Sequence, residues 1–334
     1  MRRLWAQLFL FPFILVLLIL RGAVAGQASS SMESAKTANS SASRQTFSPN
    51  GSPDAAVESE SPTFELKPDA SGAISQEQMR QLFRIVTDKD QENDKRQRDY
   101  TYLERDVERQ LDGKGQVKST ETKTYEVMEI YGEQVNRLIA KDDKPLSEKD
   151  AAKEEEKVQK VTAKRKNESD NDRRKREEKE AKDREEGRKF VNEVADAFNF
   201  KLVGNEEVGG REAWVIDAEP RPGYEAHTKE AKFLTKMRGR VWIDKSDLQL
   251  SKMDAEALDT ITFGLFLARL HKGAHFTMEQ TRVNDEVWLP RFLTFNIDAR
   301  VALLKEYRIA GEQSFKEYKK FRSESKIVGY EEVK

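Results

Sequence analysis

The chain has 334 residues, of which 37% are hydrophobic and 36% are charged, and its formal net charge is −1. With a net charge this close to zero, the protein as a whole is not expected to bind nucleic acid by electrostatic attraction. The chain contains no cysteine, which excludes disulfides, thiolate catalysis, cysteine-ligated metals and a lipid-modified N-terminal cysteine.

The first 25 residues have the pattern of a secretory signal peptide. Arg2 and Arg3 form a basic start, residues 4–20 form an apolar core, and an Ala-Val-Ala triplet precedes the expected cleavage point after Ala25. We therefore expect residues 1–25 to be removed and the mature chain to be exported. The alternative is an uncleaved anchor in the inner membrane, because about 17 apolar residues lie near the lower limit for spanning a bilayer.

Residues 26–73 are rich in Ser, Ala, Gly and Pro. They contain too little apolar surface to offset the entropy of ordering them, so we expect a disordered tether. Ordered structure begins near Ser75, which is a suitable helix N-cap. The apolar positions of the helix that follows recur at helical spacing; they are Met79, Leu82, Phe83 and Val86.

Residues 100–141 alternate polar and apolar side chains, which is typical of antiparallel strands with one solvated face. The Asp-Gly-Lys-Gly at 112–115 predicts a hairpin turn, and the Tyr-Gly-Glu at 131–133 predicts a second one. This region therefore contributes three strands.

A charged block at about 145–189 mixes both signs densely, with Glu and Lys repeatedly four residues apart. We expect either an inserted, solvated helical hairpin with a break near residues 167–172 or a partly disordered insertion. Its other possible role is to dock a protein partner. Interleaved signs and the lack of aromatic residues argue against nucleic acid. The next residues place Phe190, Val194 and Phe198 on one helical face, which predicts a helix that plugs a curved sheet.

From residue 200 onward the chain is expected to form further strands, which gives roughly eight to eleven in all. Helices before and within the strand series indicate an α+β fold, and a sheet this wide should curl. Residues 264–270 are either a strand in the middle of a packed core or the wall of a cavity. The residues expected to line the concave side are Val241, Ile243, Leu248, Leu250, Phe263, Leu265, Leu267, Leu293, Phe295 and Ile297.

Four segments carry a resemblance to a known family. They are REAWVIDAEP (211–220), GRVWIDKSDLQLSKMD (239–254), VNDEVWLPRFLTFNIDARV (283–301) and FKEYKKF (315–321). Together they resemble the outer-membrane lipoprotein-sorting, LolA-like proteins of Gram-negative bacteria. The resemblance covers about residues 75–322, with the charged block as an insertion, and implies a domain at 74–325 followed by a tail at 326–334.

The resemblance implies a strongly curved antiparallel sheet, or unclosed β-barrel, with helices covering its concave side. It also implies a periplasmic protein that binds lipid, lipoprotein or another apolar ligand there. The alternative is a structural or regulatory envelope protein whose helices fill the concavity and whose charged insertion docks a protein partner. For a carrier of this kind the resemblance also implies an arginine inside the cavity that holds the helices in place. Arg105, Arg109 and Arg137 are candidates, and the sequence does not single out one of them.

No catalytic constellation is visible, and the sequence predicts neither an enzyme nor a cofactor. His271 and His275 are four residues apart, but Gly273 and the strand-like surroundings favour surface histidines over metal ligands. The acidic residues of Asp244–Asp247 fit a β-turn in which aspartate caps backbone N–H groups better than they fit a calcium loop.

Overall fold

The structure is a computed structural model that describes residues 64–228, 230–263, 268–301 and 305–321. The expected signal peptide, most of the tether, the C-terminal tail, Leu265 and Leu267 lie outside these residues. Among the described residues, no helix is both long and apolar enough to cross a membrane.

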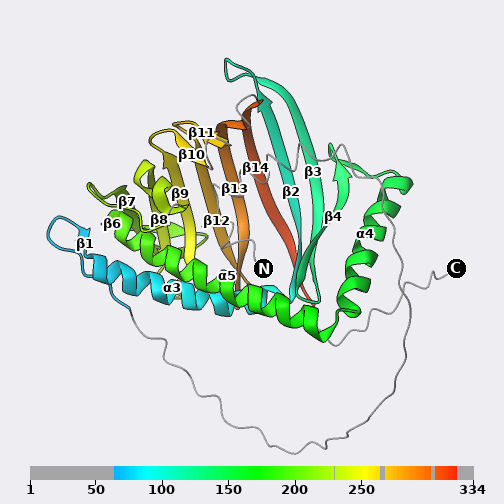
Figure 1. The fold of residues 1–334 in the computed structure, drawn as a ribbon, viewed down its shortest axis with the longest axis horizontal. Coiled ribbons are helices and arrows are strands. Elements are labelled where there is room, and N and C mark those ends of the chain that lie inside the picture. Colours follow the sequence, from blue (N-terminus) through cyan, green and yellow to red (C-terminus); the bar gives the residue numbers. More distant parts are fainter. Residues whose placement is uncertain (1–63, 229, 264–267, 302–304, 322–334) are drawn as a thin grey trace, which may run out of the picture.

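A single antiparallel sheet of fourteen strands dominates the described chain (Figure 1). Its order is β1-β6-β7-β8-β9-β12-β13-β14-β2-β3-β4-β5, with β10 and β11 attached beside β13, and the sheet is not closed. The long strands are β2 (Tyr100–Leu111), β3 (Val117–Ile130), β4 (Glu133–Lys141), β6 (Phe198–Val208), β7 (Arg211–Pro220), β8 (Met237–Asp244), β9 (Leu250–Ala257), β12 (His275–Val283), β13 (Val287–Val301) and β14 (Lys305–Lys320). The predicted α+β class and antiparallel pairing are confirmed.

The strand number exceeds the expected eight to eleven because four strands have only two or three residues. Such short strands carry no alternation that a sequence could reveal. They are β1 (Ala73–Ile74), β5 (Lys144–Pro145), β10 (Ile261–Phe263) and β11 (Ala268–Leu270).

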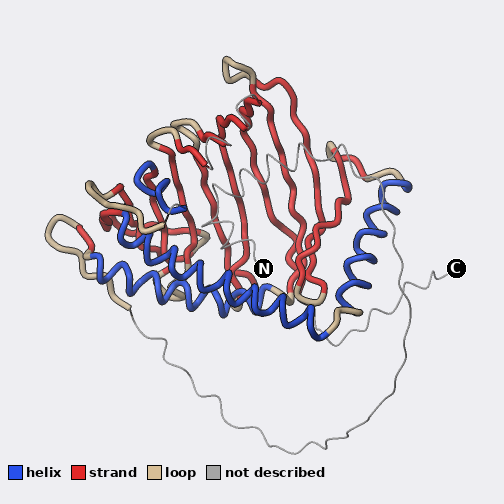
Figure 2. The backbone as a smooth tube through the Cα atoms, viewed as in Figure 1, coloured by secondary structure: helices blue, strands red, loops and turns tan. Residues whose placement is uncertain are grey.

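The helices of the described chain are α3 (Gln76–Gln97), α4 (Glu148–Lys166), α5 (Asp170–Ala197) and the 3-10 helix η1 (Glu230–Lys236). The Ser75 hydroxyl accepts a hydrogen bond from the Gln78 N–H at 3.2 Å, which confirms the predicted N-cap. Helices α3 and α5 run side by side across one face of the sheet (Figure 2), and we call this the inner face.

The second part of the charged block and the apolar helix after it form one continuous helix, α5. The expected break is present, because α4 ends at Lys166 and α5 begins at Asp170 after its N-cap Ser169. Beyond that point Glu-Lys and Glu-Arg pairs in adjacent turns support the charged part of the helix. The predicted insertion is therefore tied directly to the part of α5 that packs on the protein.

One local prediction needs correction. Leu248 lies in the β8–β9 turn with a φ of 52° and not on a strand, because β9 begins at Leu250. Pro290 lies within β13, where the register with β12 shifts by one residue. A bulge tolerates proline because its missing N–H breaks no ladder hydrogen bond there.

Candidate functional site

The inner face between β6 and β13 carries a continuous apolar surface. Strand register places its side chains on the same face, since paired residues point the same way in an antiparallel ladder. We call this surface the apolar strip, and it comprises Phe200, Ile216, Val241, Ile243, Leu250, Phe276, Met278, Leu293 and Phe295. All of these residues belong to one hydrophobic core or pack against it.

Most of the predicted lining residues that the structure describes belong to this surface. Ile297 continues it into a second apolar cluster with Ala257 and Leu270. Leu248 is 4% exposed but lies in the turn, and Phe263 is the last residue of β10. The alternation on β8 and β13 thus brought the expected residues together on one face.

Helix α3 covers the apolar strip directly. Its residues Met79 and Leu82 are fully buried and Val86 is 2% exposed. All three belong to the same core cluster as the strip. Full burial of such side chains contributes roughly 1.5–3 kcal/mol each, so the helix is an integral part of the core.

The predicted plug is also seated on the protein. Phe190 stacks on Phe233 of η1 with ring centroids 6.0 Å apart, and Val194 packs against the core cluster. Phe198 is buried as well, but it is the first residue of β6 and not part of the helix. The apolar strip is therefore occupied by the chain's own helices.

Polar contacts that the sequence did not predict fix the end of α5. The Arg80 guanidinium on α3 donates to the Asp196 carboxylate at 2.5 Å. Glu193, which is 6% exposed, accepts hydrogen bonds from the Tyr224 hydroxyl at 2.9 Å and from the backbone N–H of His227 at 2.6 Å. The sequence signal that could have predicted this contact is Glu193 itself, a single glutamate among the apolar positions of a helix, because a buried carboxylate needs hydrogen-bond partners.

The arginines expected inside the cavity lie on the other side of the sheet. Register places Arg105, Arg109 and Arg137 on its outer face. Arg105 pairs with Asp143 at 2.8 Å and Arg109 with Glu312 at 3.1 Å, whereas Arg137 pairs with Glu155 of helix α4 at 3.1 Å and so holds that helix from outside the cavity. The helix-to-helix ion pair comes instead from Arg80, which lies on α3 and not on a strand.

The inner face changes character at β14. Strand β2 presents Glu104, Asp106 and Glu108 on the same side as the apolar strip, and β3 adds Glu121 opposite Glu108. We call these four residues the acidic strip. Burial raises the pKa of Asp106 to about 6 and also raises that of Glu108. Sequence alternation identified two sets of residues on β2 but not which set faces inward.

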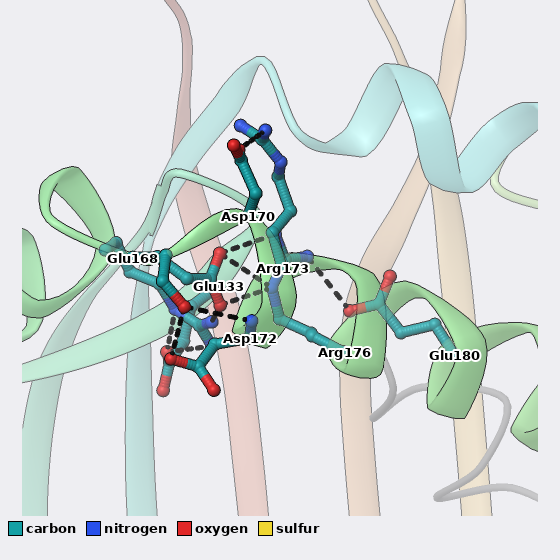
Figure 3. A network of polar contacts seen from close by, with 9 residues as sticks. Glu133, Glu168, Asp170, Asp172, Arg173, Arg176 and Glu180 are labelled. Atoms are coloured by element: carbon teal, nitrogen blue, oxygen red, sulfur yellow. Dashed lines mark hydrogen bonds and ion pairs between the residues drawn. The ribbon is translucent and has the colours of Figure 1, made fainter.

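Helix α4 and residues 170–186 of α5 form a helical arm beside β4. No residue of α4 is buried. The corner between the helices is held by ion pairs, in which Glu168 accepts from Arg165 and Arg176 at 3.0 Å (Figure 3). Arg165 also donates to Glu133 of β4 at 2.6 Å, so the arm is attached to the sheet through charges.

The remaining candidates have ordinary structural roles. His271 lies 3.0 Å from Asp298 and His275 lies 2.9 Å from Asp254, so the two imidazoles engage different carboxylates. The Asp244 carboxylate accepts from the backbone N–H of Ser246 and Asp247 at 3.0 and 2.7 Å. The predicted capped β-turn is confirmed.

Neither a family model nor a curated protein matches the chain. Similar solved structures include a LolA superfamily protein from Nitrosomonas europaea (8% identity, 71% of this chain and 93% of that one, TM-score 0.29). They also include a putative outer membrane lipoprotein-sorting protein domain from Vibrio parahaemolyticus (11% identity, 75% of this chain and 95% of that one, TM-score 0.31). A third is the MucA/MucB complex of Pseudomonas aeruginosa (8% identity, 71% of this chain and 99% of that one, TM-score 0.17). The LolA-like architecture expected from the sequence, an unclosed antiparallel sheet with helices over its inner face, is present in the sheet itself.

Proposed function

We propose that the protein is an exported, non-enzymatic envelope protein that binds a protein partner through its helical arm. The observation that carries this proposal is the seating of α3 and α5 on the apolar strip. Two pockets of about 190 and 430 Å3 open on described residues, and neither is lined by a predicted lining residue. The surface most available to another molecule is therefore the arm.

The arm has features of a docking element. Most of the stability of a helix in a protein comes from packing an apolar face against the rest of the chain, and α4 buries no residue. Its ends are nevertheless capped by Ser147 and anchored through Arg165. Because α4 is held in place but does not contribute to the core, we infer that its exposed, charged surface serves to contact a partner protein.

Site-specific photo-crosslinking tests this role. A photoreactive amino acid replaces Lys160, which is highly exposed on α4, and as a matched control it replaces the exposed Glu219 on β7. In the native host we expect one discrete protein adduct from position 160 and none from position 219. Equal adducts at both positions, or none at position 160, would contradict partner binding by the arm.

Export to the periplasm rests on the composition of residues 1–25. Determining the N-terminus of the protein purified from its host tests this directly. A mature chain that begins at Gly26 supports cleavage, whereas an intact Met1 in the membrane fraction supports the anchored alternative.

Lipid or acylated-polypeptide binding is the second candidate, because the covered surface is itself continuous and apolar. Such a ligand can reach the strip only if the two helices that cover it, α3 and α5, move apart. The chain has no native cysteine, so Arg80→Cys with Asp196→Cys allows a short crosslinker to fix α5 to α3 at the place where these residues meet. The crosslink should abolish binding of a fluorescent fatty acid, and reduction of the crosslink should restore it. Binding that survives the crosslink, or is absent without it, rules this candidate out.

A further inference from the structure

The positive and negative charges that are interleaved in the sequence of α4 are separated on its surface. Most of its lysines recur at intervals of four, four, three and four residues, which places them on one face of the helix. We call this surface the lysine face, and it consists of the exposed residues Lys149, Lys153, Lys157, Lys160 and Lys164. From the first lysine to the last it extends over roughly 22 Å along the helix axis.

Two acidic residues of α4 are turned toward the sheet. Glu155 lies 3.1 Å from Arg137 of β4, and Glu154 accepts a hydrogen bond from the backbone N–H of Leu138 at 3.4 Å. Both glutamates and Val158 are half-buried, and helical spacing places them across α4 from the lysine face. These contacts fix the rotation of α4 about its own axis, so the lysines point away from the sheet beside which the helix stands (Figure 1).

One carboxylate interrupts the lysine face. Helical spacing places Glu156 among the lysines, and it lies 2.6 Å from Lys160. The exposed residues Ala152 and Ala163 beside the lysines offer no large apolar side chain. Helices that bind along a membrane surface combine basic residues with apolar side chains that enter the lipid, and a uniformly anionic surface would repel Glu156. The pattern fits a protein partner, which can place a donor opposite Glu156, better than it fits a membrane.

We propose that the protein partner of the helical arm presents a row of Asp and Glu side chains to the lysine face. This inference rests on the proposed function, which assigns a partner to the arm, and adds the chemistry by which that partner is recognised. Exposed ion pairs contribute little individually, so recognition by charge acts mainly through the rate of association and the exclusion of wrong partners. An acidic helix of about 15 residues has the length that matches the lysine face.

Photo-crosslinking in charge-reversed variants of the full chain tests the proposal in the native host. A photoreactive amino acid replaces Ala152, and Lys160→Glu with Lys164→Glu reverses the lysine face about two turns away. The matched control is Lys175→Glu with Lys179→Glu, an exposed pair of the same spacing on α5. We expect reversal of the lysine face to lower the yield of the protein adduct about tenfold or more and the control to leave it unchanged. The crosslinked peptide of the partner should be rich in Asp and Glu.

The outcomes separate this inference from the proposed function. No adduct from position 152 of the otherwise unaltered chain would mean that the arm has no partner, and both would fail. An adduct of equal yield after reversal would mean that a partner binds without acidic side chains, which overturns this inference alone. A phospholipid adduct in place of a protein adduct, or equal loss in the control variant, also overturns it, in favour of a membrane or of unspecific attraction.

If circular dichroism shows that the reversed variant loses helix, Lys160→Gln with Lys164→Gln replaces it, because glutamine has nearly the helix propensity of lysine. This milder change should lower the adduct yield roughly threefold, and an unchanged yield overturns the proposal. Where the reversed variant folds, lysines in place of the acidic residues of the crosslinked partner segment should restore the adduct. A failure to restore it would show that the two charged rows do not pair.

Discussion

The two halves of the inner face differ in chemistry although they belong to one sheet. From β6 to β13 the inner face is apolar, and α3 and the apolar end of α5 pack on it. From β14 to β4 it carries the acidic strip, and the charged end of α5 runs past it toward α4 (Figure 1). The composition of α5 changes near Gly187, so the helix matches the half of the sheet that it crosses. The fold thus separates a core-forming half from a polar half along a single helix.

The largest expected effect comes from opening the core-forming half. Leu82→Ala removes a fully buried side chain of α3 beneath the helix pair, and such a cavity costs about 2–5 kcal/mol. We expect the free energy of unfolding, measured by urea denaturation, to fall by that amount.

Leu138→Ala on β4 is the matched change in the polar half, where the leucine is only half-buried. It should cost less than about 1 kcal/mol. Equal losses for the two variants would show that the two halves contribute equally to the core, and the contrast drawn above would be wrong.

The apolar half was the easier one to predict from sequence. Val241 and Ile243 stand two residues apart on β8, and the period of a strand places both on one face of the sheet. The sequence did not show that Leu248 lies in a turn, because a positive φ angle cannot be recognised from hydrophobic periodicity. On β2 both alternating sets contain charges, so hydrophobic periodicity could not show that Asp106 faces inward. The small pocket beside Val208, Arg211 and Trp288 is formed by turns that are far apart in the sequence, so no local pattern could predict it.

A close contact lies at the boundary between the halves, where Phe295 of β13 pairs with Gly311 of β14. A Cβ at Gly311 would lie 2.3 Å from the Phe295 ring, so glycine is required where the aromatic side chain crosses the neighbouring strand. We expect Gly311→Ala to cost about 1–3 kcal/mol through overpacking.

Adding Phe295→Leu to Gly311→Ala should recover part of that loss, because the smaller side chain makes room for the new methyl group. A double-mutant cycle by chemical denaturation measures this coupling. Strictly additive losses would mean that the two residues do not restrain each other.

The acidic strip should destabilise the protein at neutral pH. Burial raises the pKa of Asp106 to about 6, above its ordinary value near 3.8, and its Oδ1 atom has no hydrogen-bond partner among the described residues. The folded state therefore holds the proton more tightly, so the stabilising effect is complete below about pH 4 and is lost as the pH rises through about 6. Asp106→Asn should raise the free energy of unfolding by about 1–2 kcal/mol at pH 7 and have little effect at pH 4.

Asp112 provides a control of opposite sign. Hydrogen bonds from the backbone N–H groups of Gln116 and Lys114 lower its pKa, so its charged form stabilises the fold at neutral pH, and Asp112→Asn should not stabilise. Thermal melts between pH 4 and 8 compare the two variants. A pH slope for Asp106→Asn that matches the unaltered chain would show that this carboxyl is not responsible.

The smallest effect is expected at the corner of the helical arm. Arg176 pairs with Glu168 at 3.0 Å and with Glu180 at 3.4 Å, and partly exposed pairs of this kind contribute about 0–1 kcal/mol each. Arg176→Ala should therefore leave global unfolding almost unchanged and act locally, by loosening the joint between α4 and α5. Hydrogen exchange should speed up in residues 163–176 but not in α3, and high salt should produce the same pattern in the unaltered chain because it screens the same charges. If exchange in α3 rose equally, the arm and the core would unfold together, and the polar half would be as integral to stability as the apolar one.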